Sequence, residues 1–389
     1  MSAQSPYLPQ GVPAPPNTGN EQLGQGAPSP FIHEEKPAYP IHRRDDRASG
    51  FFSFLDPILG PVGKAFDSLS ERRRALGLPS PGTTDTLQRE VKSTLLTNFF
   101  FDGAKADLTK ALSINPIFQV THGFSLGGTD KNGTVPSSYN FNCVYGSDNV
   151  FFQGGVDDGG SVQMRANTEW APGHTSKIQG NLTKGTQGSF VQLEHDYRGI
   201  DHSANFKTLN PSPTDGSGIY IVNYIQSLTK NFALGLETIY QRQSADTQDA
   251  MVGYMGKWTS TNRDSIATFQ FQSQGVLNAT YWQRLTDKVD VAGDFNVISA
   301  GGKREASTTL GAKYDFRMST LRCQIDNSFK VSSQLETRLA PTFAFTVGGE
   351  IDHLSTLARF GVGISIESPS SDLQFDPTGP QPTPPNVPM

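Results

Sequence analysis

Titratable side chains in this sequence do not form a recognisable catalytic motif. His195 and His353 lie near carboxylates, but none of the 7 histidines has a partner at metal-ligand spacing. The Asp157-Asp158 pair falls in an expected turn and does not form a general acid–base pair. The sequence contains neither a phosphate-binding glycine-rich loop with its lysine nor a nucleophile elbow. It therefore predicts no enzyme, no metal and no cofactor.

A different chemistry fits the acidic side chains, namely weak and reversible attraction of positively charged groups. One set of carboxylates falls on the polar face of segments whose apolar residues recur at every second position: Glu169, Glu194, Asp196, Glu237, Asp290, Asp294, Asp326, Glu336 and Glu350. The same face is expected to carry Lys207, Lys313, Arg322 and Arg338. One close pair of opposite charges in water contributes about 1 kcal/mol, so no single carboxylate would trap a cationic partner. Alternatively, these charges only solvate a water-filled space and pair with one another.

The amino-acid composition argues against several classes of protein. Lys+Arg number 32 against 37 for Asp+Glu, so there is no basic excess to predict nucleic-acid binding. Cys143 and Cys323 are far apart and are expected to be small apolar fillers rather than a disulfide or a zinc site. The first thirty residues contain no apolar run typical of a secretory signal. No run of 18 apolar residues predicts a transmembrane helix.

From about residue 102 to residue 367, apolar and polar residues alternate. Clear examples are residues 289–297, 306–315, 331–339, 343–351 and 359–366. This is the period of a β-strand with one apolar and one polar face. Short turn-like stretches join the segments, which predicts antiparallel hairpins. A spacing of roughly 14 residues per strand and turn gives about nineteen strands of membrane-spanning length.

A soluble sandwich also alternates, but two features favour a closed transmembrane β-barrel. The polar face carries many charges, whereas the apolar face mixes small residues with large ones, and lipid does not require the close packing of a soluble core. Closing a long meander also removes every strand edge, as lipid requires. A propeller would show a blade-length repeat, and none is visible.

Four regions follow from the composition. Residues 1–48 and 368–389 are rich in proline and are expected to be disordered tails. Residues 49–100 are expected to be helical, with helices near residues 61–76 and 85–97, and residues 101–367 form the barrel. Asp85 with Gln88 resembles a capping box. Leu87, Val91 and Leu95 form a narrow apolar stripe, which suits a helix lying on a wall.

The last expected strand has the form polar, x, Gly, x, x, apolar, x, apolar. Arg359, Gly361, Ile364 and Ile366 occupy the defining positions, and the pattern resembles the sorting signal of mitochondrial outer-membrane barrels. Aromatic residues are candidates for membrane-interface girdles or for partner contacts: Tyr220, Tyr224, Tyr240, Tyr281 and Trp282.

Several collinear stretches resemble the channel-forming subunits of the mitochondrial outer-membrane protein translocase, within the eukaryotic mitochondrial porin superfamily. They are residues 101–112 (FDGAKADLTKAL), 115–119 (NPIFQ), 192–197 (QLEHDY), 207–211 (KTLNP), 234–240 (LGLETIY), 311–314 (GAKY) and 349–353 (GEIDH). The likeness runs from about residue 50 to residue 367, and the proline-rich ends are consistent with a fungal member. The resemblance implies a nineteen-strand barrel whose first and last strands pair in parallel. It also implies a helix inside the pore, here residues 85–97.

The same resemblance implies import of presequence-bearing precursor proteins across the mitochondrial outer membrane. Implied partners are those precursors, a single-span receptor, small single-span subunits, further copies of the chain and the lipid bilayer, without nucleic acid. The nearest alternative is a metabolite pore like the voltage-dependent anion channels. The long N-terminal region and the acidic face favour protein import, and a soluble all-β binding protein is a more distant alternative.

Overall fold

The computed structural model describes residue 73 and residues 76–127, 129–130, 133–134, 136–184, 188–243, 247–300 and 303–368. The tails expected at 1–48 and 368–389 lie outside these residues, apart from Ser368. The helix expected at 61–76 also lies outside them, apart from Arg73 and Leu76. Within the described ranges, no helix is long and apolar enough to span a membrane.

Nineteen strands form one continuous sheet. They are β1 Gly103–Ser113, β2 Ile117–Leu126, β5 Ser138–Gly146, β6 Val150–Asp157, β7 Val162–Ala171, β8 His174–Leu182, β9 Phe190–Arg198, β10 His202–Leu209, β11 Gly218–Ser227, β12 Phe232–Arg242, β13 Gln248–Thr259, β14 Ser265–Gln272, β15 Val276–Thr286, β16 Val289–Ala300, β17 Lys303–Asp315, β18 Ser319–Asp326, β19 Lys330–Ala340, β20 Phe343–Asp352 and β21 Leu357–Ser368. A separate two-stranded sheet, β3 Thr129–Asp130 with β4 Gly133–Thr134, lies between β2 and β5 in the sequence. The large sheet confirms the predicted number of strands.

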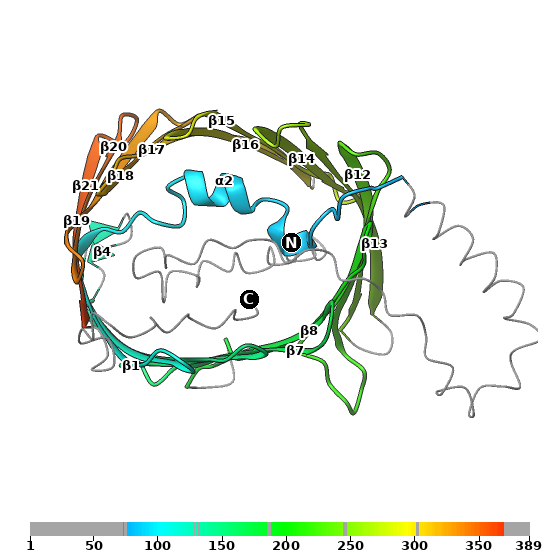
Figure 1. Ribbon diagram of the computed structural model, residues 1–389, viewed down its shortest axis with the longest axis horizontal. Helices are drawn as coiled ribbons and strands as arrows, with labels where there is room; N and C mark the ends of the chain where they lie inside the picture. Colours follow the sequence, from blue (N-terminus) through cyan, green and yellow to red (C-terminus); the bar gives the residue numbers. More distant parts are fainter. Residues whose placement is uncertain are drawn as a thin grey trace, which may run out of the picture.

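Strands β1 and β21 close the sheet into a barrel and run parallel, from Gly103 opposite Gly361 to Lys110 opposite Ser368. The other neighbouring strands of this sheet are antiparallel, and β2 pairs with β5. In an up-and-down order, an odd number of strands leaves the first and last pointing the same way. Nineteen strands therefore close only through a parallel pair, and Figure 1 shows the resulting ring.

The segment before β1 lies inside this ring, where Figure 1 shows helix α2 enclosed by the strands. It contains the short 3₁₀ helix η3, Thr84–Thr86, and α2, Arg89–Thr94. The helix is shorter than the one predicted at 85–97, because Leu95 already has extended backbone angles. The predicted capping box is wrong, since Gln88 makes no side-chain cap and instead donates from Nε2 to Asn278 Oδ1 at 2.8 Å.

The inner segment runs from one mouth of the barrel to the other. Arg73 contacts Asp201, which lies in the turn between β9 and β10, and the backbone oxygen of Ser227 at the end of β11. Because successive strands alternate in direction, this mouth is opposite the one where β1 begins at Gly103. The C-terminal end of β21 lies at the same mouth as Arg73. The described chain therefore enters and leaves the barrel at one end and crosses the lumen once.

Candidate functional site

Contacts with the inner segment define which side chains of the barrel face the lumen. Leu87 packs against Ile225, Ala233 and Met255. A second apolar cluster joins Val91 and Leu95 to Trp282 and Ala292. Since side chains alternate along a strand, and residues paired across strands share a face, these contacts assign both faces of the whole sheet.

The outer face carries large exposed apolar side chains, as a lipid-facing surface should. Examples on neighbouring strands are Leu234, Leu236, Tyr254 and Phe269. Trp282 was a candidate for an interface girdle or a partner contact, but it is only 4% exposed and packs inside against α2.

The nine carboxylates predicted from alternation all lie on strand positions of the inner face. Asp290 and Asp294 flank Ala292, which packs against α2. Asp294 pairs with Thr309, and Thr309 pairs with Asp326, so these residues share the inner face. The same reasoning from strand pairing and alternation places the remaining six: Glu169, Glu194, Asp196, Glu237, Glu336 and Glu350.

Lys177 of β8 lies at the centre of a buried ion cluster on this inner wall. Its Nζ atom is 2.7 Å from Asp196 Oδ2, 3.3 Å from Glu194 Oε1 and 3.0 Å from Asp85 Oδ2. The side chains of Asp196 and Glu194 are only 1% and 3% exposed. Asn205 also donates from Nδ2 to Glu194 Oε1 at 2.7 Å. The cluster therefore ties η3 to two neighbouring strands.

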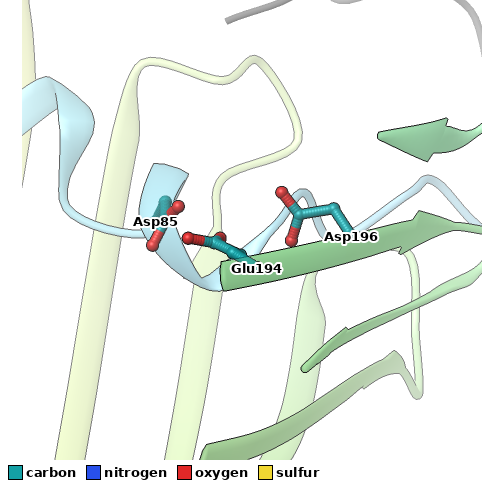
Figure 2. A group of neighbouring side chains, drawn as sticks. All are labelled: Asp85, Glu194 and Asp196. Atoms are coloured by element: carbon teal, nitrogen blue, oxygen red, sulfur yellow. The ribbon is translucent and has the colours of Figure 1, made fainter. Parts of the chain in front are cut away.

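Figure 2 shows the three carboxylates of the cluster, with Asp85 from η3 facing Glu194 and Asp196 of β9. Burial alone would raise the pKa of Asp85, but Lys177 and Lys207 outweigh it and hold that pKa well below its usual range. The Lys207 ammonium lies 3.4 Å from Asp85 Oδ1 and 3.5 Å from Glu194 Oε2. Asp85 is therefore ionised at neutral pH.

Three carboxylates this close also resemble a metal site, since their oxygens lie within 4.8 Å of one another. The Lys177 ammonium contacts all three and supplies the positive charge that a metal would supply. The arrangement is an ion cluster that fastens the inner segment to the wall.

Other carboxylates of the inner face are also paired. Glu350 contacts Lys330 at 2.9 Å, and Glu336 lies 3.6 Å from Arg322. Asp290 lies 3.6 Å from Arg284. Two more accept amide hydrogen bonds, Glu237 from Gln272 at 3.1 Å and Asp294 from Asn278 at 3.2 Å. The lumen is thus a wall of local ion pairs and amides, without a nucleophile and base arranged for covalent chemistry among these residues.

One family model matches most of this sequence. The model described as "Eukaryotic porin" matches residues 80–362, which includes the inner helix and nearly all of the barrel. The chain belongs to the eukaryotic porin family.

Individual relatives of this eukaryotic porin cover most of its length. It is 38% identical over 336 residues to the "Mitochondrial import receptor subunit tom40" of Neurospora crassa, covering 83% of this chain and 93% of that protein. It is 35% identical over 343 residues to the "Mitochondrial import receptor subunit TOM40" of Saccharomyces cerevisiae, covering 83% and 87%. Identity to the human TOM40 homologue is 28% over 302 residues, covering 74% and 79%.

The four residues of the expected sorting signal lie on both faces of β21 in this porin. Arg359 faces inward, 3.9 Å from Glu350. Gly361 also faces inward, and a Cβ atom there would overlap the backbone oxygen of Phe101. Ile364 and Ile366 point outward and are exposed. Gly361 therefore has a packing role at the β1–β21 seam, whatever its role in sorting.

Sequence reasoning missed Lys177, the cation at the centre of the buried ion cluster in this porin. Lys177 was absent from the expected inner set, although β8 alternates Thr175, Lys177, Gln179 and Asn181 on the inner face. The same alternation that placed the carboxylates would have found it. No pattern in the sequence predicted the contacts of Arg322. Its guanidinium donates to the Ser93 backbone oxygen and lies 4.2 Å from the centre of the Phe99 ring.

Proposed function

We propose that this chain is a protein-conducting channel that imports unfolded, presequence-bearing precursors across the mitochondrial outer membrane. The observation that carries the proposal is 38% identity over 83% of the chain to a mitochondrial import receptor subunit. The closed barrel and polar lumen supply the path that such an activity needs. The protein is a transporter in the mitochondrial outer membrane, which it crosses with nineteen strands.

Cargo contacts are assigned to the carboxylates of the inner face that remain partly exposed. These are Glu169, Glu237, Asp290, Asp294, Asp326 and Glu336. Basic presequences would be drawn to them by attractions of about 1 kcal/mol each, weak enough to allow release. Glu194, Asp196 and Glu350 are buried in ion pairs and would chiefly hold the wall and the inner segment in place.

The partners of the channel follow from its place in an import machinery. They would be a single-span receptor, small single-span subunits and further copies of the chain, all packing on the apolar outer face within lipid. The signal at Arg359, Gly361, Ile364 and Ile366 would direct insertion of the barrel.

Planar-bilayer conductance of the purified, reconstituted chain tests this function. Titration with a basic presequence peptide should block a cation-preferring pore, and added salt should weaken the block. A peptide of the same length with its Lys and Arg replaced by Gln should block far less. An anion-preferring pore indifferent to both peptides would instead identify a metabolite channel.

A further inference from the structure

A group of histidines and aromatic rings lies on the outer face of β7 to β10, away from the lumen. His195 stands between the inward-facing Glu194 and Asp196, so its ring points outward. His174 shares the outer face with Ile178, which is 45% exposed. Import through the lumen does not involve this group.

Two ring nitrogens in this group are close together. His174 Nδ1 lies 3.3 Å from His195 Nε2, and the ring centroids are 5.5 Å apart. Zinc binds imidazole nitrogens at about 2.0–2.1 Å, so two such ligands in tetrahedral geometry stand about 3.4 Å apart. The pair therefore already has the separation that one tetrahedral cation requires of two ligands.

The second nitrogen of His195 is also held in place. Ser176 Oγ lies 3.0 Å from His195 Nδ1 and accepts a hydrogen bond from Trp170 Nε1 at 3.1 Å. When His195 Nδ1 donates to Ser176, its Nε2 is unprotonated and accepts the hydrogen bond from His174 Nδ1. A cation would take the place of that shared proton, with His174 shifting to its Nε2–H tautomer. Outer hydrogen bonds of this kind fix the tautomer and orientation of metal-binding histidines. His202 stands apart, paired with Asp201 at 3.0 Å.

We propose that His174 and His195 bind one divalent transition-metal cation, of the Zn²⁺ or Cu²⁺ class, on the outer face of the barrel. Neutral imidazole is a preferred ligand for these ions, whereas Mg²⁺ and Ca²⁺ prefer oxygen ligands. His174 is the first residue of β8 and adjoins the β7–β8 turn at the rim of the barrel, so water can fill the other coordination positions.

Copper titration of the full-length protein in detergent tests the site, because Cu²⁺ quenches nearby tryptophan fluorescence. The Trp170 ring lies 5.5 Å and 5.7 Å from the rings of His174 and His195. The signal of wild type minus that of Trp170→Phe isolates this reporter. We expect saturable quenching with one ion per chain, reversed by excess Zn²⁺ and unaffected by Mg²⁺.

Substitutions of the two ligands decide the assignment. His174→Gln and His195→Gln should each weaken binding by at least about tenfold, and Ser176→Ala by about 10- to 100-fold. His122→Gln is the matched control, since His122 also lies on the outer face, hydrogen-bonded to Tyr139 at 2.8 Å on distant strands. Bilayer conductance confirms that each variant forms a barrel. Equal copper affinity in wild type and both Gln variants would overturn the proposal.

Electron paramagnetic resonance of the wild-type copper complex gives a reading that needs no variant. Coupling to two imidazole nitrogens is expected. A signal with one or no coupled nitrogen would reject the paired site.

Discussion

The ammonium of Lys177 lies 3.0 Å from a carboxylate oxygen of Asp85, although 92 residues separate them in the sequence. This ion pair joins the wall of the barrel to the segment inside it. Because Lys177 also pairs with Glu194 and Asp196, one side chain helps set both the position of the segment and the charge of the wall beside it.

Replacing Lys177 by Met should destabilise the barrel by about 3–5 kcal/mol, because it leaves the buried Asp196 without the counter-charge that Lys177 supplies. The change should also raise the preference for cations, since it removes a positive charge from the lumen. Denaturant unfolding in detergent and reversal potentials in a KCl gradient measure the two effects.

Lys313→Met is the matched control for this substitution. It also removes one positive charge from the inner face, but Lys313 pairs at 2.6 Å with Asp315, which is 39% exposed. A loss below about 1 kcal/mol is expected there. Equal losses in both variants would show that burial of the Lys177 cluster does not matter.

Docking of the inner segment should resist acid. A carboxylate whose pKa is lower in the folded state than in the unfolded state stabilises the folded state at every pH above the unfolded pKa of about 4. This stabilisation is lost as the pH falls through the lower, folded-state pKa. Since the pKa of Asp85 is lowered, the segment should stay docked from pH 8 to about pH 4.

Trp282 reports this docking, because it packs against Val91 and Leu95. Its emission, isolated in a Trp170→Phe, Trp258→Phe background, should hold steady over that range and shift only in stronger acid. Asp85→Asn should shift the emission already at pH 7. A wild-type transition centred near pH 6 would assign control of docking to another group.

The seam between β1 and β21 should reject any side chain at Gly361. A Cβ atom there would overlap the Phe101 backbone oxygen, so Gly361→Ala should cost about 1–3 kcal/mol. Gly348→Ala is the control, since its Cβ would meet Phe100 at an ordinary 3.5 Å. Unaided refolding into detergent measures packing apart from sorting, and normal refolding of Gly361→Ala would contradict the assignment.

Neutralising carboxylates along the proposed path should weaken peptide block without closing the pore. Glu237→Gln and Asp294→Asn should each reduce presequence affinity by about fivefold at low salt, and less at high salt. Asp264→Asn changes a carboxylate in the turn between β13 and β14 and should have no effect. Unchanged block in both path variants would remove these residues from the cargo route.

Alternation in the sequence predicted the barrel because the two-residue period is a local property of each strand. It also placed Asp290 and Glu336 on the inner face. Side chains alternate along a strand, so knowing the face of one residue gives the face of every other residue in that strand. The number of strands followed from chain length and turn spacing.

Contacts between distant segments were beyond this reasoning. The helix predicted at 85–97 ends at Thr94 because Leu95 turns toward the wall and the Leu96 amide donates to Gln324 at 2.8 Å. Tertiary contacts here outweighed helix propensity. The partnership of Asp85 with Lys177 likewise depends on which strands face the segment, and local patterns do not contain that information.

The enclosed segment places a constraint on the order of folding. Pairing of Gly103 with Gly361 joins residues far apart in the sequence, and ordering so long a loop is slow and entropically costly. The β1–β21 seam is therefore expected to form late. Once it forms, the segment joined to β1 is topologically trapped, and it can enter or leave the ring only along the pore axis.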